Sequence, residues 1–269
     1  MTNPLADPVP APPAAEIEAA ALGLVGTASA EGLRVRLIGG LAIRIQSPSA
    51  ARPPFARSYG DLDLVAGNRD VGALRRLLER QGYVADKLFN AIHGAQRLLY
   101  TRHDGRWSVD VVIDQLAMSH TIEFRERLST DGPTIDLADL LLSKLQIWET
   151  NRKDLDDATC LLADHPLAPV GRLVAGPDAD GSPGPIDLVR IRSVLGADWG
   201  FCHTVERNLR TVAELWASEP IPGVRYAVDA QVASLLADIE AVPKSIGWRA
   251  RARVGERIRW YETPEEARR

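Results

Sequence analysis

Two aspartates separated by one residue form the pattern in this chain that is best suited to chemistry. Asp61 and Asp63 lie in the segment SYGDLDLVA, whose alternation predicts a strand over residues 59–66. Their side chains leave the same face of that strand, with Cα atoms about 6.5–7 Å apart, and can therefore share a divalent cation. The residues between and after them are apolar, so we expect a half-buried strand, where paired carboxylates need a cation or a proton. The alternative is a strand whose polar face lies in water.

A third carboxylate is available in the segment RWSVDVVID. Alternation places Val109 and Val111 on one face of this strand and Asp110 on the other. Three carboxylates can hold two Mg²⁺ ions, or Mn²⁺ in their place, about 3.5–4 Å apart; such ions activate an attacking hydroxyl and neutralise a leaving pyrophosphate. The alternative is that Asp110 and Asp114 face solvent on an edge strand.

Two glycines upstream suit the binding of a triphosphate. Gly39 and Gly40 follow a predicted buried strand over residues 33–38 and precede a predicted helix over residues 41–45. Bare backbone N–H groups at such a junction can approach phosphate oxygens, and the helix N-terminus faces them. An ordinary strand-to-helix turn is the alternative.

The order of these parts resembles a known superfamily. IGGLAIRI, RSYGDLDLV and VDVVI together resemble the DNA polymerase beta-like nucleotidyltransferases. The later stretch DLLLSKLQIWETNRKDLDDATCLL resembles the lysine and aspartate motif of the AbiEii-type nucleotidyltransferases, the toxins of type IV abortive-infection and related toxin–antitoxin systems. The resemblance covers roughly residues 35–162 and implies an enzyme that uses Mg²⁺ and an NTP and releases pyrophosphate.

The resemblance implies roles for the residues of the first motifs. Gly39 and Gly40 become the turn that grips the nucleotide, and Asp61 and Asp63 the metal ligands. Arg57 precedes the aspartates, as a basic residue does in those relatives.

Lys144 becomes the lysine that contacts phosphate, and Asp154 and Asp157 match the final acidic motif. A compact ammonium on the inner face of a helix can offset charge on the triphosphate, and we expect stability to depend little on it. The alternatives are a lysine that snorkels to solvent and acids that favour a helix N-terminus.

This sequence departs from the family pattern in two places. Leu41 follows the glycines where a Ser or Thr is frequent, so one hydroxyl contact to phosphate is missing. The loop between Gly40 and Asp61 is also longer than in minimal members and contains Pro48, Pro53 and Pro54. Both departures bear on nucleotide affinity and NTP preference, and neither removes a metal ligand.

The elements that position these residues predict an α/β (α+β) fold, in which a mixed sheet with flanking helices precedes a C-terminal helical domain. The patterns predict helices over residues 16–29, 70–81, 136–150 and 153–163, and a hairpin of residues 96–101 and 107–113. The expected units are a disordered lead-in (1–15), a nucleotidyltransferase domain (16–164), a linker (165–185) and a helical domain (186–269).

Composition excludes several other classes of protein. The formal charge of −4 indicates no polyanionic or polycationic partner by itself. The two cysteines, Cys160 and Cys202, exclude a disulfide framework and have no zinc-ligand spacing. The first 15 residues lack the features of a signal peptide, and no run approaches the roughly 18 apolar residues that span a bilayer, so we expect a cytoplasmic protein without a membrane partner.

The C-terminal segment GWRARARVGERIRWYE combines arginines with aromatic residues, a combination that suits phosphate contacts and base stacking. The alternative is a charged surface helix anchored by its tryptophans. Its arginines are Arg249, Arg251, Arg253, Arg257 and Arg259.

The family resemblance implies an RNA acceptor, with a tRNA 3′ end as the leading case, and an antitoxin protein as partner. One rival is the same chemistry on a small molecule, as in antibiotic nucleotidyltransferases. The other is a non-catalytic nucleotide- or RNA-binding regulatory protein that has kept the fold.

Overall fold

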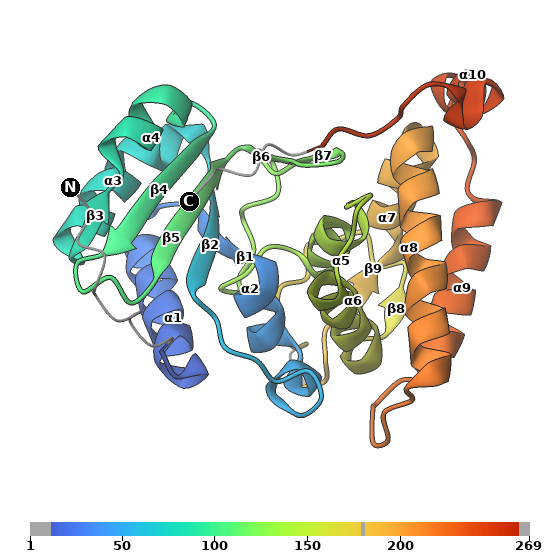
Figure 1. The fold of residues 1–269 in the computed structure, drawn as a ribbon, viewed down its shortest axis with the longest axis horizontal. Helices are drawn as coiled ribbons and strands as arrows, with labels where there is room; N and C mark the ends of the chain where they lie inside the picture. Colours follow the sequence, from blue (N-terminus) through green and yellow to red (C-terminus); the bar gives the residue numbers. More distant parts are fainter. Residues whose placement is uncertain (1–11, 179–180, 264–269) are drawn as a thin grey trace, which may run out of the picture.

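Five strands form the mixed sheet that carries the three predicted carboxylates, Asp61, Asp63 and Asp110 (Figure 1). The computed structural model describes residues 12–178 and 181–263. The strand order is β1-β2-β5-β4-β3, in which β2 and β5 are parallel and the other neighbours are antiparallel. The strands are β1 (Val35–Ile38), β2 (Asp61–Ala66), β3 (Tyr83–Ala85), β4 (Arg97–Arg102) and β5 (Ser108–Ile113).

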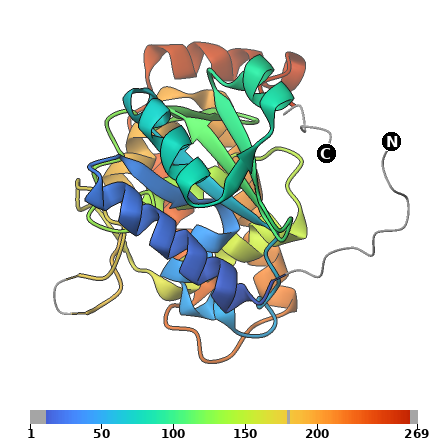
Figure 2. The same ribbon diagram turned by 90° about the vertical axis from the view of Figure 1, so that its left-hand side faces the viewer.

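Helices cover both faces of this sheet. Figures 1 and 2 show α1 (Ala14–Ala30) and α3 (Val71–Arg80) over one face, whereas α2 (Gly39–Gln46), α5 (Leu137–Leu145) and α6 (Arg152–Asp164) lie on the other side. The α/β class predicted from the sequence is confirmed. Helix α1 begins at Ala14, two residues before the predicted helix start at residue 16; residues 1–11, which belong to the predicted lead-in, lie outside the described part.

The hairpin of β4 and β5 forms where its alternation predicts. Val109 and Val111 are fully buried, and Asp110 between them is on the opposite face. Gly105 has a φ of 73° in the connecting turn, a conformation that glycine adopts without steric penalty. At the edge of β4, a short helix, α4 (Lys87–His93), supplies the Asn90 side chain, whose amide both donates to and accepts from the backbone of Leu99.

Helix α5 is shorter than its sequence pattern predicts. It begins where Asp136 accepts hydrogen bonds from the backbone of Ala138 and Asp139, and it ends at Leu145 rather than at Thr150. Asn208 explains the early end, because its side-chain amide donates to the carbonyls of Leu145 and Ile147, both at 2.8 Å. Caps of this kind satisfy carbonyls that a continuing helix would otherwise bond.

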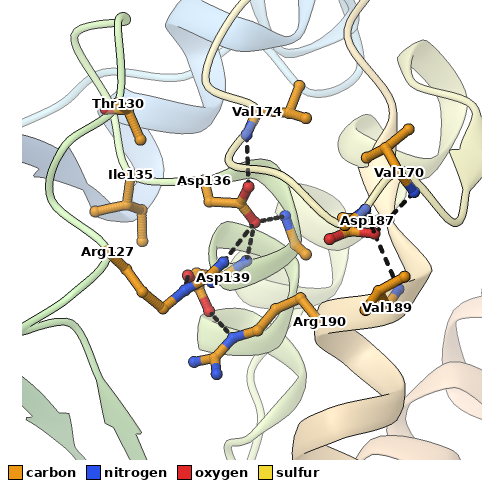
Figure 3. A network of polar contacts seen from close by, with 12 residues as sticks. Arg127, Thr130, Ile135, Asp136, Asp139, Val170, Val174, Asp187, Val189 and Arg190 are labelled. Atoms are coloured by element: carbon orange, nitrogen blue, oxygen red, sulfur yellow. Dashed lines mark hydrogen bonds and ion pairs between the residues drawn. The ribbon is translucent and has the colours of Figure 1, made fainter.

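A buried acidic pair ties α5 to segments far from it in the sequence (Figure 3). Asp139 accepts from Arg127 at 2.5 Å and from Arg190 at 2.7 Å, while Asp136 accepts from the backbone N–H of Val174 at 2.7 Å. Val174 lies within the predicted linker, so part of that segment packs on α5. The division of the chain at residues 165–185 stays a prediction.

The C-terminal part is helical, as predicted. Three of its helices, α7 (Leu188–Ala197), α8 (Trp199–Ser218) and α9 (Val228–Ala241), pack on α5 and α6, which therefore lie between them and the sheet (Figure 1). The last helix, α10 (Ile246–Val254), packs on α7 and α8.

Several short elements complete the structure. The hairpin of β6 (Gln115–Ala117) and β7 (Thr121–Glu123) and the parallel pair of β8 (Leu167–Ala168) and β9 (Ile186–Asp187) lie outside the main sheet. Three 3₁₀ turns cover Pro48–Ala51, Asn68–Asp70 and Gly255–Arg257. Among the described helices, none has the length and apolar character needed to span a membrane.

Candidate active site

The register of β2 against β5 brings the predicted carboxylates together. Asp63 and Asp110 are direct neighbours in the parallel ladder, and Asp61 is two residues before Asp63 on the same face. The opposite face is fully buried at Leu62 and Val109, so the three aspartates project toward the side of the sheet on which α2 lies. Residues that are 47 positions apart in the sequence thus form one acidic cluster, which we call the carboxylate cluster (Asp61, Asp63 and Asp110).

The two glycines bring backbone directly against this cluster. Ile38 pairs with Asp63 across β1 and β2, so Gly39 comes next to the Asp63 carboxylate. A Cβ at Gly39 would lie 3.1 Å from Cγ of Asp63 and closer still to Oδ2, and Gly39 has a φ of 77°. Helix α2 begins at Gly39, whereas the sequence pattern predicts its start at Leu41. The N–H groups of the first turn of α2 therefore begin beside the carboxylate cluster.

Gly40 makes the corresponding approach on the other side. A Cβ there would lie 3.4 Å from Oδ2 of Asp157 and would overlap Nη2 of Arg57. The glycine pair therefore separates two charged groups, with the carboxylate cluster beside Gly39 and the Arg57–Asp157 pair beside Gly40. Any side chain at either position would displace a charged group.

Crowding of negative charge perturbs Asp63. Burial, followed by the charges of Asp61 and Asp110, raises the pKa of Asp63 from its usual value of 3.8 to about 7, although Lys144 and Arg97 act in the opposite direction. An acid with these neighbours is stabilised either by a proton or by a cation. The cluster therefore has the electrostatic character of a cation site.

Asp110 is bound by an arginine that the sequence analysis missed. Arg97 on β4 donates from Nε to Oδ1 at 2.7 Å and to Oδ2 at 3.0 Å, and its Nη2 also donates to Oδ2. Leu99 pairs with Asp110 across the hairpin, so Arg97 is two residues along on the same face. Counting residue pairs outward from the hairpin turn gives the register of β4 against β5, and that register could have identified Arg97 as a neighbour of Asp110.

The bound arginine bears on whether a metal ion fits. In the described part of the chain, no group of three or more His, Cys, Asp and Glu side chains is arranged to hold a metal ion. The oxygen donors of Asp61, Asp63 and Asp110 are of the type that Mg²⁺ and Mn²⁺ prefer. Arg97 donates to both carboxylate oxygens of Asp110, so a metal ion at Asp110 would compete with the arginine for the same carboxylate.

Lys144 lies in a buried ion-pair network rather than at an open surface. Its ammonium is 2.8 Å from Asp154 and 3.0 Å from Asp157, and Asp157 also pairs with Arg57 at 2.8 Å. Burial would lower the pKa of Lys144, but Asp157 and Asp154 outweigh it and raise the pKa above its usual value. These ion pairs argue against the expectation that stability depends little on this lysine, because its removal would leave Asp157, which is 2% exposed, with one cation fewer.

Asp154 and Asp157 are positioned by the start of α6. Asn151 caps that helix by accepting from the backbone N–H of Asp154, and its side-chain amide donates to the Asp154 carboxylate at 2.7 Å. Arg57, Lys144, Asp154 and Asp157 are thus one connected group, and the structure places it on the Gly40 side of the glycine pair. The sequence pattern named all four residues without indicating that they pair with one another.

Two of the C-terminal arginines, Arg251 and Arg259, line a cavity of about 480 Å³ between the start of α8 and the first half of α10, together with several aromatic residues. Trp199 stacks on His203, and Arg251 lies over the Trp199 ring at 4.8 Å. Arg251 also donates to the carbonyls of Gly255 and Ile258, so part of its role is to support the local backbone. Trp148 lies outside α5, and its ring stacks on Tyr261.

The sequence matches no protein-family model and no curated protein. Several solved structures are similar in fold, including the following two. The antibiotic-resistance factor ANT(2'')-Ia matches with a TM-score of 0.36 and 11% identity over 54% of this chain and 83% of that chain. An antigenic nucleotidyltransferase-like protein from Paracoccidioides brasiliensis matches with a TM-score of 0.39 and 12% identity over 87% of this chain and 96% of that chain. Similarity at this level carries no argument about substrate or reaction.

Proposed function

We propose that this chain is a Mg²⁺-dependent nucleotidyltransferase that moves a nucleoside monophosphate from an NTP to an acceptor hydroxyl and releases pyrophosphate. The observation that carries the proposal is the side-by-side placement of Asp63 and Asp110, with Asp61 on the same face and the bare backbone of Gly39 against Asp63. A carboxylate cluster beside a helix start that can receive phosphate suits transfer of a nucleotidyl group.

The carboxylate cluster would hold Mg²⁺ or Mn²⁺, which supplies charge neutralisation and an activated acceptor hydroxyl when bound. Gly39 and Gly40 leave their backbone open to the triphosphate, and the first turn of α2 directs its N–H groups and dipole toward it. Close approach of phosphate to backbone requires glycine at these positions, because a side chain would occupy the same space.

Lys144 acts on the reacting phosphate through its charge. Its ammonium lowers the pKa of Asp63, so its field reaches the carboxylate cluster even though its hydrogen bonds go to Asp154 and Asp157. Arg57 shares Asp157 with Lys144 and keeps that carboxylate from neutralising the lysine alone. We propose that the four residues form a charge-balanced support that holds one ammonium close to the triphosphate.

An RNA acceptor, with a tRNA 3′ end as the leading case, is the substrate class that we propose. Three arginines lie on α10 without an acidic residue among them, at Arg249, Arg251 and Arg253. A cavity lined by tryptophans and arginines next to that helix suits stacking of bases and contact with phosphates. The cavity lining balances Arg251 and Arg259 with Asp198 and Glu262, so the positive charge that would disfavour a cationic aminoglycoside lies on α10.

The family resemblance extends the proposal to a biological role. A toxin that modifies tRNA ends would be held inactive by an antitoxin protein. Expression of the chain alone should then arrest growth, and expression of the Asp63→Ala variant should not. Equal growth with both variants, at equal protein levels, would remove the toxin role and leave the chemistry to be tested separately.

The decisive experiment incubates the purified protein with Mg²⁺ and each α-³²P-labelled NTP in turn, with total RNA, with tRNA or without RNA. Label should move to RNA with one preferred NTP, and Asp61→Ala or Asp63→Ala should abolish the transfer while leaving the circular dichroism spectrum unchanged. Label transfer to a small cationic antibiotic instead of RNA would support the antibiotic-type rival. Nucleotide binding without any transfer would support the non-catalytic rival.

A further inference from the structure

Arg97 forms an ion pair with one member of the carboxylate cluster, Asp110. Its guanidinium engages both oxygens of Asp110, with Nε at 2.7 Å and 3.0 Å and Nη2 also donating. The two side chains come from neighbouring strands, β4 and β5, so the contact is between rigid elements.

The pair is nevertheless accessible. The Arg97 side chain is 41% exposed and that of Asp110 is 16% exposed. The guanidinium carbon of Arg97 also lies 6.0 Å from the centre of the Phe89 ring on α4, so the ring is a second neighbour of the guanidinium. Because the guanidinium end of the pair is open to solvent, Arg97 can leave Asp110 without becoming a buried unpaired charge.

We propose that Arg97 exchanges partners during the reaction cycle. In the nucleotide-free protein it holds Asp110, and when a nucleoside triphosphate and its metal ion bind, Asp110 passes to the metal and Arg97 passes to phosphate oxygens. The inference rests on the proposed function and adds a phosphate-binding residue to it. Guanidinium groups bind carboxylate and phosphate with the same bidentate geometry, so the exchange replaces one set of hydrogen bonds by an equivalent set.

The exchange predicts opposite effects on the two ligands. A metal ion that binds alone must displace Arg97 from Asp110 without offering the arginine a new anion, so Arg97 weakens metal binding. A triphosphate offers that anion, so Arg97 strengthens nucleotide binding. Metal and nucleotide are therefore coupled through this one side chain, and the coupling is reciprocal.

The test measures the affinity for Mn²⁺ and the affinity for nucleotide separately. Electron paramagnetic resonance of free Mn²⁺ gives the first. Calorimetry with the α,β-methylene analogue of each of the four NTPs, in excess Mg²⁺, gives the second. Arg97→Ala should bind Mn²⁺ without nucleotide roughly three- to tenfold more tightly than wild type. The same variant should bind the preferred analogue about tenfold or more weakly. Arg97→Lys keeps the charge without the planar fork and should fall between wild type and Arg97→Ala for both ligands.

Arg102→Ala is the matched control. Arg102 is at the other end of β4 and pairs with Asp104 at 3.0 Å, so its removal should change neither affinity. A second control removes the partner: in an Asp110→Asn background, Arg97→Ala should no longer tighten Mn²⁺ binding, because the arginine has no carboxylate to release.

The outcomes separate the inference from the proposed function. Unchanged or weaker Mn²⁺ binding by Arg97→Ala, or unchanged nucleotide binding, overturns the exchange, provided that wild type binds both ligands. A wild-type protein that binds neither Mn²⁺ nor any of the four analogues overturns the proposed function itself. Should Arg97→Ala fail to fold, Arg97→Lys carries the same opposite-sign test.

Discussion

The carboxylate of Asp63 rests against the bare α-carbon of Gly39. A Cβ at that glycine would lie 3.1 Å from Cγ of Asp63 and 3.2 Å from its Cβ, and nearer still to Oδ2. The contact follows from register, since Ile38 pairs with Asp63 and the chain turns at once into α2. One glycine therefore sets both the position of a carboxylate of the cluster and the start of the helix that faces it.

The first prediction tests this contact with Gly39→Ala. The added methyl group would displace Asp63, and the φ of 77° at Gly39 is unfavourable for alanine. We expect transfer to fall at least about 100-fold, because misplacement of a reacting group by about 1 Å has effects of that size. Labelled-NTP transfer to RNA measures the loss.

Gly26→Ala on α1 is the control for this substitution. Nothing lies within 4 Å of a Cβ built at Gly26, which is inside a helix of 17 residues. It should leave transfer unchanged and raise the free energy of unfolding by about 0.5–1 kcal/mol, measured by urea denaturation. Full transfer by Gly39→Ala would show that the close contact has no part in the chemistry.

The strands of the carboxylate cluster could be predicted from the sequence because their signals are local. Alternation in β2 places Asp61 and Asp63 on one face of that strand. Alternation in β5 places Asp110 on the face that Val109 does not share, and the structure confirms both assignments. The glycine pair likewise marks the end of β1 by its own composition. The sequence does not indicate which strands are neighbours, and that pairing is what joins Asp63 to Asp110.

A second prediction concerns pH. The pKa of Asp63 is raised to about 7, first by burial and then by Asp61 and Asp110, so at lower pH a proton competes with the metal ion. Transfer at limiting Mg²⁺ should therefore increase as the pH rises through about 7, and a higher Mg²⁺ concentration should move the midpoint to lower pH. A midpoint that does not respond to Mg²⁺ would contradict this assignment.

The same shift affects stability, with the opposite trend. Because the folded-state pKa of Asp63 lies above its unfolded value of 3.8, the folded protein holds the extra proton between about pH 4 and pH 7. The contribution of Asp63 to stability is therefore greatest below about pH 4 and is lost as the pH rises to about 7. Asp63→Asn should gain thermal stability relative to wild type across that interval, and calorimetric melting temperatures at about pH 4 and pH 8 measure it.

The third prediction distinguishes Asp110, which lies within β5, from Asp114, which directly follows that strand. Asp110→Asn should lose nearly all transfer, because the amide is a poor metal ligand and a poor partner for Arg97. Asp114→Asn should keep most of it. Asp114 has a φ of 62°, accepts from the backbone of Asn68 and pairs with Arg125, so its role is structural, and asparagine tolerates that backbone conformation. If Asp114→Asn loses transfer and Asp110→Asn keeps it, the catalytic role has been assigned to the wrong aspartate.

The remaining parts of the site could not be predicted because they depend on distant partners. Arg97 meets Asp110 only through the register of β4 against β5. The end of α5 depends on Asn208, which is 63 residues beyond Leu145. The strands β3, β6 and β7 have three residues each, too few for periodicity to distinguish them from loops.

The last prediction concerns Lys144, which has both an electrostatic and a structural role. Its ammonium is the cation shared by Asp154 and Asp157, at 2.8 Å and 3.0 Å, and its side chain is only 13% exposed. Lys144→Ala should therefore lower the free energy of unfolding by about 3 kcal/mol, the scale for breaking a buried ion pair from one side. It should also reduce transfer by about 10²–10³ at a temperature where the variant is folded, since one charge at the reacting phosphate is removed.

Lys153→Ala is the matched control for Lys144→Ala. This lysine is exposed at the start of α6, and its loss should change the free energy of unfolding by less than about 0.5 kcal/mol and leave transfer intact. Lys144→Arg keeps the charge as a planar fork and should lose less of both quantities than Lys144→Ala. If the folded Lys144→Ala protein transfers nucleotide at the wild-type rate, the lysine is purely structural, and the motif that distinguishes the AbiEii-type resemblance from the wider superfamily carries no catalytic role in this chain.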